Sequence, residues 1–331
     1  MNSFGRLFQV SIFGESHGES VGIVIDGVPA GLSLSAEDLL PDLERRKGGK
    51  QKGTTPRQEA DYPFFKSGLF NGKTTGFPIA IFFENNNTRS EDYNKQRSIP
   101  RPGHADWVAH QKFGGNEDYR GGGHFSARLT TGLVAAGALA KKLMPGVMIK
   151  AAVTEIGGEA DLEKGLQKAI DAKDSVGGLI ECRVSGMPVG LGEPYFDSIE
   201  SVLAHMLFTI PAVKGVEFGA GFAAAKMFGS QHNDAIENME GKTSTNHAGG
   251  IVGGISNGND LVFRLAIKPT SSTPKEQFSL NWDTEQMENF SIKGRHDLCV
   301  ALRAPVIVEA VTAIVLADFF LLEQKMKRVV E

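Results

Sequence analysis

The chain has 331 residues, 41% of them hydrophobic, which is enough apolar material for a large buried core and excludes a chain that is disordered throughout. Its 35 Lys and Arg residues are balanced by 39 Asp and Glu, and the formal net charge of -4 excludes a global positive field that would attract nucleic acid or an anionic membrane. Any binding site for an anion must therefore be local.

The two cysteines and the N-terminal sequence indicate the cellular compartment of the protein. Cys182 and Cys299 lie far apart, and the opening "MNSFGRLFQVSIFGESHG" lacks the basic segment and apolar run of an export signal. We therefore expect two free thiols and a cytoplasmic protein. The most apolar segment, "PVIVEAVTAIVLADFFLL", contains Glu309 and Asp318, so we predict a core helix there and not a membrane span.

The N-terminal third predicts antiparallel strands. Apolar and polar residues alternate in short runs, with an Asn71-Gly72 hairpin signal, in "RLFQVSIF", "SVGIVIDGV", "FFKSGLFNG" and "TTGFPIAIFFEN". Among these runs, "LSAEDLLPDLERRKGG" predicts a helix with Ser35 as its N-cap, acidic residues in its first turns and basic residues at its end.

Two helices follow, "HADWVAHQKFGG" and "FSARLTTGLVAAGALAKKLMPG", the second stopped by Pro145 and Gly146. The longer helix keeps small residues on one side and apolar residues on the other, so we expect it to be packed from both sides. From 147 to 220 the pattern predicts strand, helix, strand, helix and strand. After 240 it predicts two strands around Asn257-Gly258, and Pro305 opens a C-terminal helix.

These elements predict an α+β fold with antiparallel sheets on the outside and helices in the middle. No stretch of the sequence has the composition of a linker. We therefore expect one large domain that spans residues 1–331.

Four polar segments flanked by glycine interrupt the strand pattern. The first, "GESHG", matches the Gly-x-Ser-x-Gly nucleophile elbow, which would make Ser16 a hydrolase nucleophile. That motif needs a helix after the serine, whereas "ESVGIVIDGVPAG" predicts a strand, so the context disfavours a hydrolase. His17 is a candidate acid or base, and the alternative is a hydrogen-bonded turn histidine.

The second segment, "ERRKGGKQKGTTPRQEAD", is strongly basic. A solvated charge run or a nucleic-acid arm would look similar, but no aromatic residue is interleaved for base stacking. Guanidinium groups beside backbone amides exposed by glycine suit a phosphate or carboxylate on a small ligand. Its basic residues are Arg45, Arg46, Lys47, Lys50, Lys52 and Arg57.

The third segment, "RPGHADW", places His104 just before a helix, six residues from His110, so the two imidazoles fall on different helix faces. With no His-Glu-x-x-His spacing either, we expect no metal site. The fourth, "YRGGGHFSARLTTG", has three glycines leading into a helix start. Exposed backbone amides there, with Ser126 and Arg128, predict an anion site.

In this order, the segments resemble the chorismate synthase family over nearly the whole chain. The matching stretches are "FGESHG", "RR" with "TTPR", "RSEDY", "RPGHAD", "DYRGGG", "SAR", "VSGMPVGLGEP", "AVKGVEFG", "NHAGGIVGGISNG", "KPTSS" and "GRHDLCV". The resemblance implies a helical layer between antiparallel sheets and an enzyme of the shikimate pathway. It also implies a 1,4 anti elimination of phosphate from 5-enolpyruvylshikimate 3-phosphate that gives chorismate and requires reduced FMN without net redox change.

The resemblance further implies roles for single residues. His17 would protonate the departing phosphate, His104 would serve the N1 side of the flavin, and Asp297, with Ser16 or Ser126, would relay a proton from the flavin. The substrate's carboxylates and phosphate would be held by Arg46, Lys52, Arg128 and Arg303. Flavin contacts would come from His124, Phe125, Ser126, Pro211, Ala212, Gly253, Lys268, Pro269, Thr270, Ser271, Ser272 and Arg295.

The chain departs from the family at two ligand contacts. The family more often has Arg-Ser-Ser where this chain has His124, Phe125 and Ser126, and Lys52 stands where arginine is usual. Members are typically homotetramers, and the resemblance leaves open whether NADPH reduces the flavin on the enzyme. A non-catalytic flavin- or phosphate-binding protein on the same scaffold is the alternative, and intact His17, His104 and Asp297 argue against it.

Overall fold

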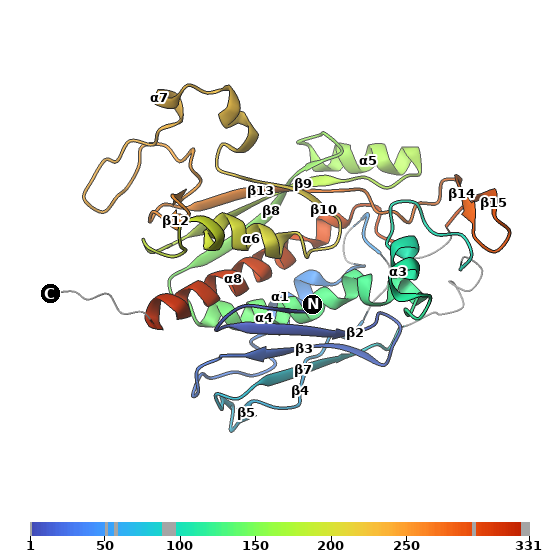
Figure 1. Ribbon diagram of the computed structural model, residues 1–331, viewed down its shortest axis with the longest axis horizontal. Helices are drawn as coiled ribbons and strands as arrows, with labels where there is room; N and C mark the ends of the chain where they lie inside the picture. The colour runs from blue at the N-terminus through green and yellow to red at the C-terminus, as the bar shows by residue number, and fades with distance from the viewer. Residues whose placement is uncertain (1, 50–51, 56–58, 88–96, 293–295, 326–331) are drawn as a thin grey trace.

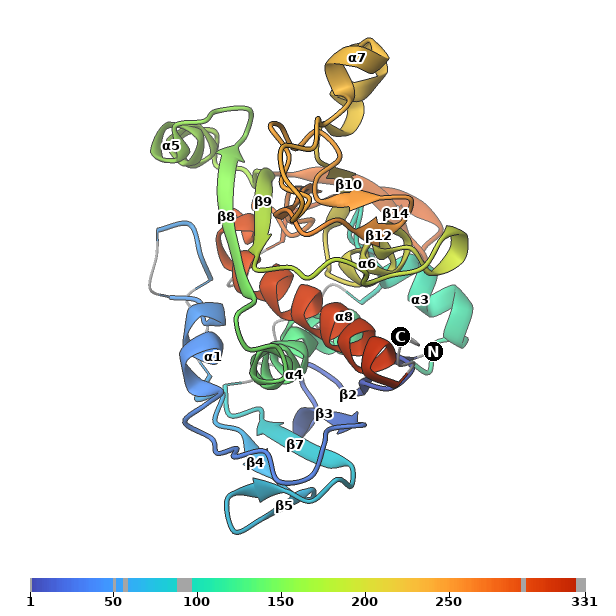
Figure 2. The same ribbon diagram turned by 90° about the vertical axis from the view of Figure 1, so that its left-hand side faces the viewer.

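Two antiparallel sheets enclose a layer of helices in the computed structural model, which describes residues 2–49, 52–55, 59–87, 97–292 and 296–325 (Figure 1). The view turned by 90° shows the same three layers, with one sheet below the helices and the other above them (Figure 2). This arrangement confirms the predicted α+β fold class.

The first sheet has the strand order β1-β2-β3-β7-β4. Alternate residues of β7, Ile79, Ile81 and Phe83, are fully buried, which is the period of two expected for a strand with one face on the core. A separate hairpin turns at Asn71 and Gly72, whose φ angles of 48° and 71° fit the predicted turn. The strands are β1 (Ser3–Phe4), β2 (Gln9–Gly14), β3 (Ser20–Asp26), β4 (Phe64–Phe65) and β7 (Ile79–Glu84), and the hairpin is β5 (Leu69–Phe70) and β6 (Lys73–Thr74).

The second sheet has the order β10-β13-β9-β8 and is also antiparallel throughout. The prediction of two strands around Asn257-Gly258 is only partly right. A strand does lie on each side, but the first belongs to a hairpin that turns at Gly253-Gly254, and the second pairs with β9 and β10 instead. The strands are β8 (Met148–Ile156), β9 (Gly178–Ser185), β10 (Val213–Phe218) and β13 (Leu261–Ile267), and the hairpins are β11 (Ile251–Val252) with β12 (Ile255–Ser256) and the unpredicted β14 (Gln277–Asn281) with β15 (Gln286–Phe290).

The central helix α4 (Thr130–Lys142) is packed from both sides, as predicted, because glycine lets each neighbour come close. A Cβ atom on Gly132 would lie 3.0 Å from Cβ of Ile23 in β3. On the opposite side, a Cβ on Gly137 would lie 2.3 Å from Cα of Ala310 in α8. The other helices are α1 (Leu40–Arg46), α3 (Asp106–Phe113), α5 (Leu162–Ala172), α6 (Ile199–Leu207), α7 (Gly229–His232) and α8 (Pro305–Lys325).

Helix α8 is the core helix that the sequence predicts. It is long and apolar enough to cross a membrane, but 78% of its most apolar window is buried inside the protein. Both of its buried carboxylates have partners. Glu309 pairs with Arg45 at 2.7 Å, and Asp318 accepts hydrogen bonds from backbone amides at the start of the chain.

The predicted start of α1 was wrong by four residues. Ser35 is not its N-cap, because Oδ2 of Asp38 accepts the Ser35 backbone N–H (2.8 Å) in a separate turn. The helix begins at Leu40, with Pro41 in its first turn, where a missing N–H costs no hydrogen bond. Its last turn still carries Arg45 and Arg46, so the predicted basic end is correct.

Candidate active site

A cavity of about 550 Å³ opens at one end of the helical layer. It is lined by the turn after β2, the end of α1, the turns before α3 and α4, the α6–β10 loop, the loop after β13 and the segment before α8. Loops from all parts of the chain therefore meet at one place. Sixteen of the residues singled out from the sequence line it: Ser16, Arg46, Lys47, His104, His124, Phe125, Ser126, Arg128, Pro211, Ala212, Lys268, Thr270, Ser271, Ser272, Asp297 and Arg303.

Other residues singled out from the sequence do not line this cavity. Lys52 is exposed, and its Nζ donates to Oε1 of Gln167 on α5 (3.0 Å). Pro269 lies between two lining residues, with its own side chain exposed. Gly253 occupies the tight turn between β11 and β12. Arg295 lies outside the described residues.

The sequence suggested that the three glycines lead directly into a helix, but in the structure they do not. Gly121, Gly122 and Gly123 have φ angles of 59°, 81° and 51°, and a short 3-10 turn separates them from α4. The chain enters this turn through Ser126, whose side chain accepts the N–H of Arg128, and the anion site expected here stays a prediction. Positive φ on three consecutive residues requires glycine and folds the chain back onto the turn after β2, where the carbonyl of Gly123 accepts the N–H of Ser16 (3.1 Å).

Two imidazoles pack against this glycine turn. A Cβ atom on Gly121 would lie 2.1 Å from Cε1 of His17, and one on Gly122 would lie 3.3 Å from Nε2 of His104. The glycines thus create room for two candidate proton carriers. His17 is only 8% exposed and lies behind Gly121, next to the fully buried Ser16 at the cavity wall.

The turn that carries Ser16 and His17 joins two strands. β2 ends at Gly14 and β3 begins at Ser20, so no helix follows the serine. A nucleophile elbow needs that helix, and the structure therefore supports the rejection of a serine hydrolase.

His104 is held by a carboxylate and a guanidinium from its own motif. Its Nδ1–H donates to Oδ1 of Asp106 (2.6 Å), since a carboxylate can only accept. Arg101 donates from Nε and Nη2 to the same carboxylate, each at 2.7 Å. Burial would raise the pKa of Asp106, but the hydrogen bonds and charges of Arg101 and His104 hold it well below its usual range. The bond fixes the ring so that Nε2 is directed at the glycine turn.

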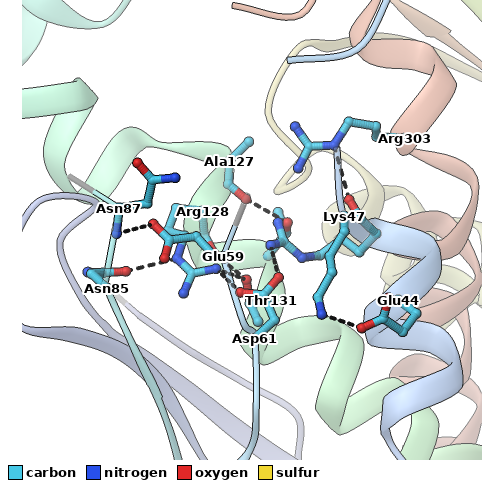
Figure 3. Close-up of polar contacts among 12 residues, drawn as sticks. Glu44, Lys47, Glu59, Asp61, Asn85, Asn87, Ala127, Arg128, Thr131 and Arg303 are labelled. Atoms are coloured by element: carbon cyan, nitrogen blue, oxygen red, sulfur yellow. Dashed lines mark hydrogen bonds and ion pairs between the residues drawn. The ribbon is translucent and has the colours of Figure 1, made fainter. Parts of the chain in front are cut away.

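A buried carboxylate lies between two of the arginines that the resemblance assigns to substrate. Asp61, 2% exposed, accepts from Nη2 of Arg46 (2.7 Å) through one oxygen and from Nη1 of Arg128 through the other. Nε of Arg128 donates to Oδ1 of Asn85 (2.9 Å). Figure 3 shows Arg128 extended between Asn85 and Asp61, with Glu59 beside it and Arg303 on the far side of the cluster.

Asp297 is tied to the third arginine. Its Oδ2 pairs with Nη1 of Arg303 (2.9 Å), and its Oδ1 accepts the backbone N–H of Thr55 (2.8 Å). Nε of Arg303 donates to the carbonyl of Arg46 (3.0 Å). Burial lowers the pKa of Arg303, an effect that the Asp297 charge opposes. The candidate proton relay and the candidate anion-binding groups therefore form one connected network.

The loop after β13 is linked to the turn before α3. Nζ of Lys268 donates to Oγ of Ser271 (2.8 Å), and Ser271 donates to the carbonyl of Gly103 (2.7 Å). Burial, and then the charge of Lys214, lower the pKa of Lys268. The buried hydroxyl of Thr270 has no hydrogen-bond partner among the residues that the structure describes.

The two residues that depart from the family pattern occupy the cavity wall. Nδ1 of His124 donates to the carbonyl of Gly14 (2.9 Å), so this imidazole is committed to the backbone of the turn after β2. Phe125 is 42% exposed, and its ring lies 6.3 Å from that of Phe113 on α3. It therefore presents an apolar surface where the family more often has a hydroxyl.

Basic groups outnumber acidic ones around the cavity, although the whole chain is acidic. The charged lining residues are Arg46, Lys47, Arg101, Arg128, Lys268 and Arg303 against Glu59, Asp61 and Asp297. The site is thus a local positive region of the kind that the composition required. No group of three or more His, Cys, Asp or Glu side chains gathers as a metal site within the described ranges.

Sequence reasoning missed Arg101, Asp106, Glu59 and Asp61. Arg101 and Asp106 flank His104 within the quoted "RPGHAD", and a carboxylate two residues after a candidate histidine was a usable signal. Glu59 and Asp61 lie at the end of the basic segment, in "TTPRQEAD", and no local pattern there indicates that they pair with arginines.

The fold and the cavity define an α+β enzyme with a positively charged site for a small anion. Comparison with known proteins makes this specific. The family model described as chorismate synthase matches residues 8–321. The chain is 68% identical over 330 residues to a chorismate synthase of Chitinophaga pinensis, covering 99% of both chains, and 44% identical to one of Dehalococcoides mccartyi, covering 100% of this chain and 99% of that one. A solved structure described as a crystal structure of chorismate synthase superposes with a TM-score of 0.72 at 28% identity, covering 97% of this chain and 93% of the other.

The chain therefore belongs to the chorismate synthase family. It is accordingly a carbon–oxygen lyase of the shikimate pathway, in a family that uses a flavin cofactor. A non-catalytic protein on the same scaffold is not supported.

Proposed function

We propose that this chain catalyses the 1,4 anti elimination of phosphate from 5-enolpyruvylshikimate 3-phosphate to give chorismate, with reduced FMN as cofactor. The carrying observation is that Ser16, His104, Asp297 and three arginines, from distant parts of the sequence, line one cavity. A trianionic or tetra-anionic substrate needs such a concentration of guanidinium groups, because each carboxylate or phosphate must exchange its water for charge-assisted hydrogen bonds.

The residues of the cavity fit a flavin. The unpartnered hydroxyl of Thr270 offers a buried hydrogen-bonding group, and Phe125 offers an apolar face. Ala212 has a φ of 75°, which is strained for a residue with a side chain and is common at ligand sites. Bound here, reduced FMN would supply electron density to the substrate as the C–O bond to phosphate breaks and would take up the ring hydrogen, so that the elimination leaves no net redox change. The proposed flavin contacts that line the cavity are His124, Phe125, Ser126, Pro211, Ala212, Lys268, Thr270, Ser271 and Ser272. Gly253, Pro269 and Arg295 are proposed on the family resemblance alone.

Proton handling falls to the residues around the glycine turn. We assign protonation of the leaving phosphate to His17. His104 would serve the N1 side of the flavin through Nε2, since its Nδ1 is committed to Asp106. Asp297, with Ser16 or Ser126, would relay a proton from the flavin.

The anionic groups of the substrate are held by Arg46, Arg128 and Arg303. All three guanidinium groups are largely buried, so water screens their charge little. Lys52, exposed and bonded to α5, is the weakest assignment of this set.

The remaining proposals concern assembly and location. Residues 1–331 form one catalytic domain, since α4 packs on β3 and β7 of the first sheet and on α8, which in turn packs on β8 and β9 of the second. The segment around α7 exposes large apolar side chains, among them Phe222, Phe228 and Met239, which favours burial against further copies in a homotetramer. We place the protein in the cytoplasm.

The test is an anaerobic assay of phosphate release from 5-enolpyruvylshikimate 3-phosphate with chemically reduced FMN. Turnover is expected, and its absence with folded protein contradicts the proposal. A second arm replaces the chemical reductant by NADPH and oxidised FMN, which decides whether the enzyme reduces its own flavin.

The variant His17→Ala tests the proposed role of His17 in the chemical step. It should lose turnover while FMN still binds, as measured by quenching of flavin fluorescence. Unchanged turnover would remove His17 from the mechanism. Labelling by a fluorophosphonate, expected to be absent, tests Ser16 as a hydrolase nucleophile.

A further inference from the structure

The structure assigns a positioning role to Asp61: we propose that its carboxylate holds Arg46 and Arg128 together as one receptor for an anionic group of the substrate. This inference rests on the proposed function, in which both arginines contact substrate. Nothing in the sequence pattern had singled out Asp61.

The geometry of the cluster supports this role. Asp61 uses one oxygen for each arginine, accepting from Nη2 of Arg46 and from Nη1 of Arg128. Both arginines line the cavity, at 4% and 6% exposure. Two long side chains that would otherwise sample many rotamers are thereby fixed at one relative orientation before a ligand arrives.

The cluster also retains a donor that a ligand could satisfy. Its charges are largely balanced inside the protein, because Glu59 lies beside Arg128 in addition to Asp61 (Figure 3). Nε of Arg46, however, is buried and has no hydrogen-bond partner among the described residues. A buried donor is costly unless a partner arrives, and a substrate carboxylate or phosphate would satisfy it.

The backbone conformation at Asp61 suits an aspartate and also allows an asparagine to replace it. Its φ of 49° lies in the left-handed region, which Asp and Asn tolerate better than most residues. Asp61→Asn therefore keeps the backbone and the shape of the side chain. Its amide has one acceptor oxygen, and its NH₂ would face the donor groups of the second arginine, so that arginine must turn away.

The experiment measures KM and kcat of Asp61→Asn for 5-enolpyruvylshikimate 3-phosphate under the anaerobic conditions above. We expect KM to rise by about 10- to 100-fold and kcat at saturation to stay within about threefold, because the chemical groups are untouched. The double variant Asp61→Asn with Arg46→Gln should lose less affinity than the sum of the two single variants, since part of what Asp61 positions is already gone in Arg46→Gln. Unchanged KM, or fully additive losses, overturns the proposal.

Asp318→Asn is the matched control, since Asp318 is an equally buried carboxylate that binds backbone amides far from the cavity. It should lower the melting temperature and leave KM unchanged. If Asp61→Asn does not fold, Asp61→Glu keeps the charge but displaces the carboxylate, and the same rise in KM is expected. An Asp61→Glu variant with native KM also overturns the proposal.

A binding measurement separates this inference from the proposed function. Calorimetry with shikimate 3-phosphate, which carries a carboxylate and a phosphate, requires no turnover. Loss of about tenfold or more in affinity on Asp61→Asn supports the positioning role even if the wild-type protein shows no elimination. Equal affinity in both proteins rejects it even if the wild-type enzyme is active.

Discussion

The imidazole of His17 packs so closely against the backbone of Gly121 that a Cβ atom on this glycine would lie 2.1 Å from Cε1 and 2.2 Å from Nδ1 of the ring. No side chain can occupy this position while His17 keeps its place. The position of the His17 ring therefore depends on residue 121 having no side chain. The φ of 59° at Gly121 is also unusual for residues other than glycine.

Gly121→Ala should displace the imidazole and lower turnover by about 100-fold or more, the usual contribution of a positioned general acid. The measurement is phosphate release at saturating substrate. Gly72→Ala is the control, because Gly72 has a similar φ of 71° but open space around a new Cβ. It should cost stability without loss of turnover, and equal turnover in the two variants would contradict the role of the Gly121 contact.

Asp106→Asn should lower kcat by about 10- to 100-fold, the usual effect of removing a carboxylate that orients a functional histidine. The amide has no charge and only one acceptor oxygen, so it cannot keep both the ion pair with Arg101 and the hydrogen bond from His104, and the ring is less firmly held. Asp171→Asn on the exposed face of α5 serves as the control and should leave kcat unchanged. A native kcat for Asp106→Asn would show that the ring needs no such support.

Gly137→Ala should destabilise the helical layer, because the new Cβ would meet backbone of α8 at 2.3 Å. Overpacking of this kind costs about 1–3 kcal/mol, which corresponds to a fall of several degrees in melting temperature. Gly229→Ala is the control, since a Cβ there meets nothing within 4 Å. Calorimetry of the two variants checks the prediction, and equal melting temperatures would refute the close crossing of α4 and α8.

Acid should destabilise the protein through its paired carboxylates. Burial acts to raise the pKa of Asp61 and of Asp106, but their arginine partners lower both pKa values below the usual range. A carboxyl group with a lower pKa in the folded state stabilises the fold above its unfolded pKa of about 3.9, and this contribution is lost as the pH falls further.

The melting temperature should therefore be nearly constant from pH 7 to about pH 5 and fall steeply below about pH 4. Asp106→Asn should flatten this acid limb, whereas Asp171→Asn should not. A melting temperature that is independent of pH down to about pH 3 would contradict the assignment of these carboxylates as stabilising ion pairs.

Several elements were predictable because their signals are local. The alternation in β7, the Asn71-Gly72 turn and the buried C-terminal helix all follow from residues within one element, and the structure contains each of them. The start of α1 was not predictable in this way, because the carboxylate of Asp38 accepts the backbone N–H of Ser35 in a separate turn before the helix.

The candidate site, too, was predictable only in its local features. The sequence by itself determined which residue types are present: histidines beside glycines, arginines in pairs, and the ordered motifs that identify the family. Only the tertiary structure decided that His17 and His104 pack against successive glycines of one turn, and that Asp61 lies between Arg46 and Arg128. The physical reason is that these contacts join segments from 15 to more than 100 residues apart, and only the packing of both sheets on α4 and α8 brings such segments together.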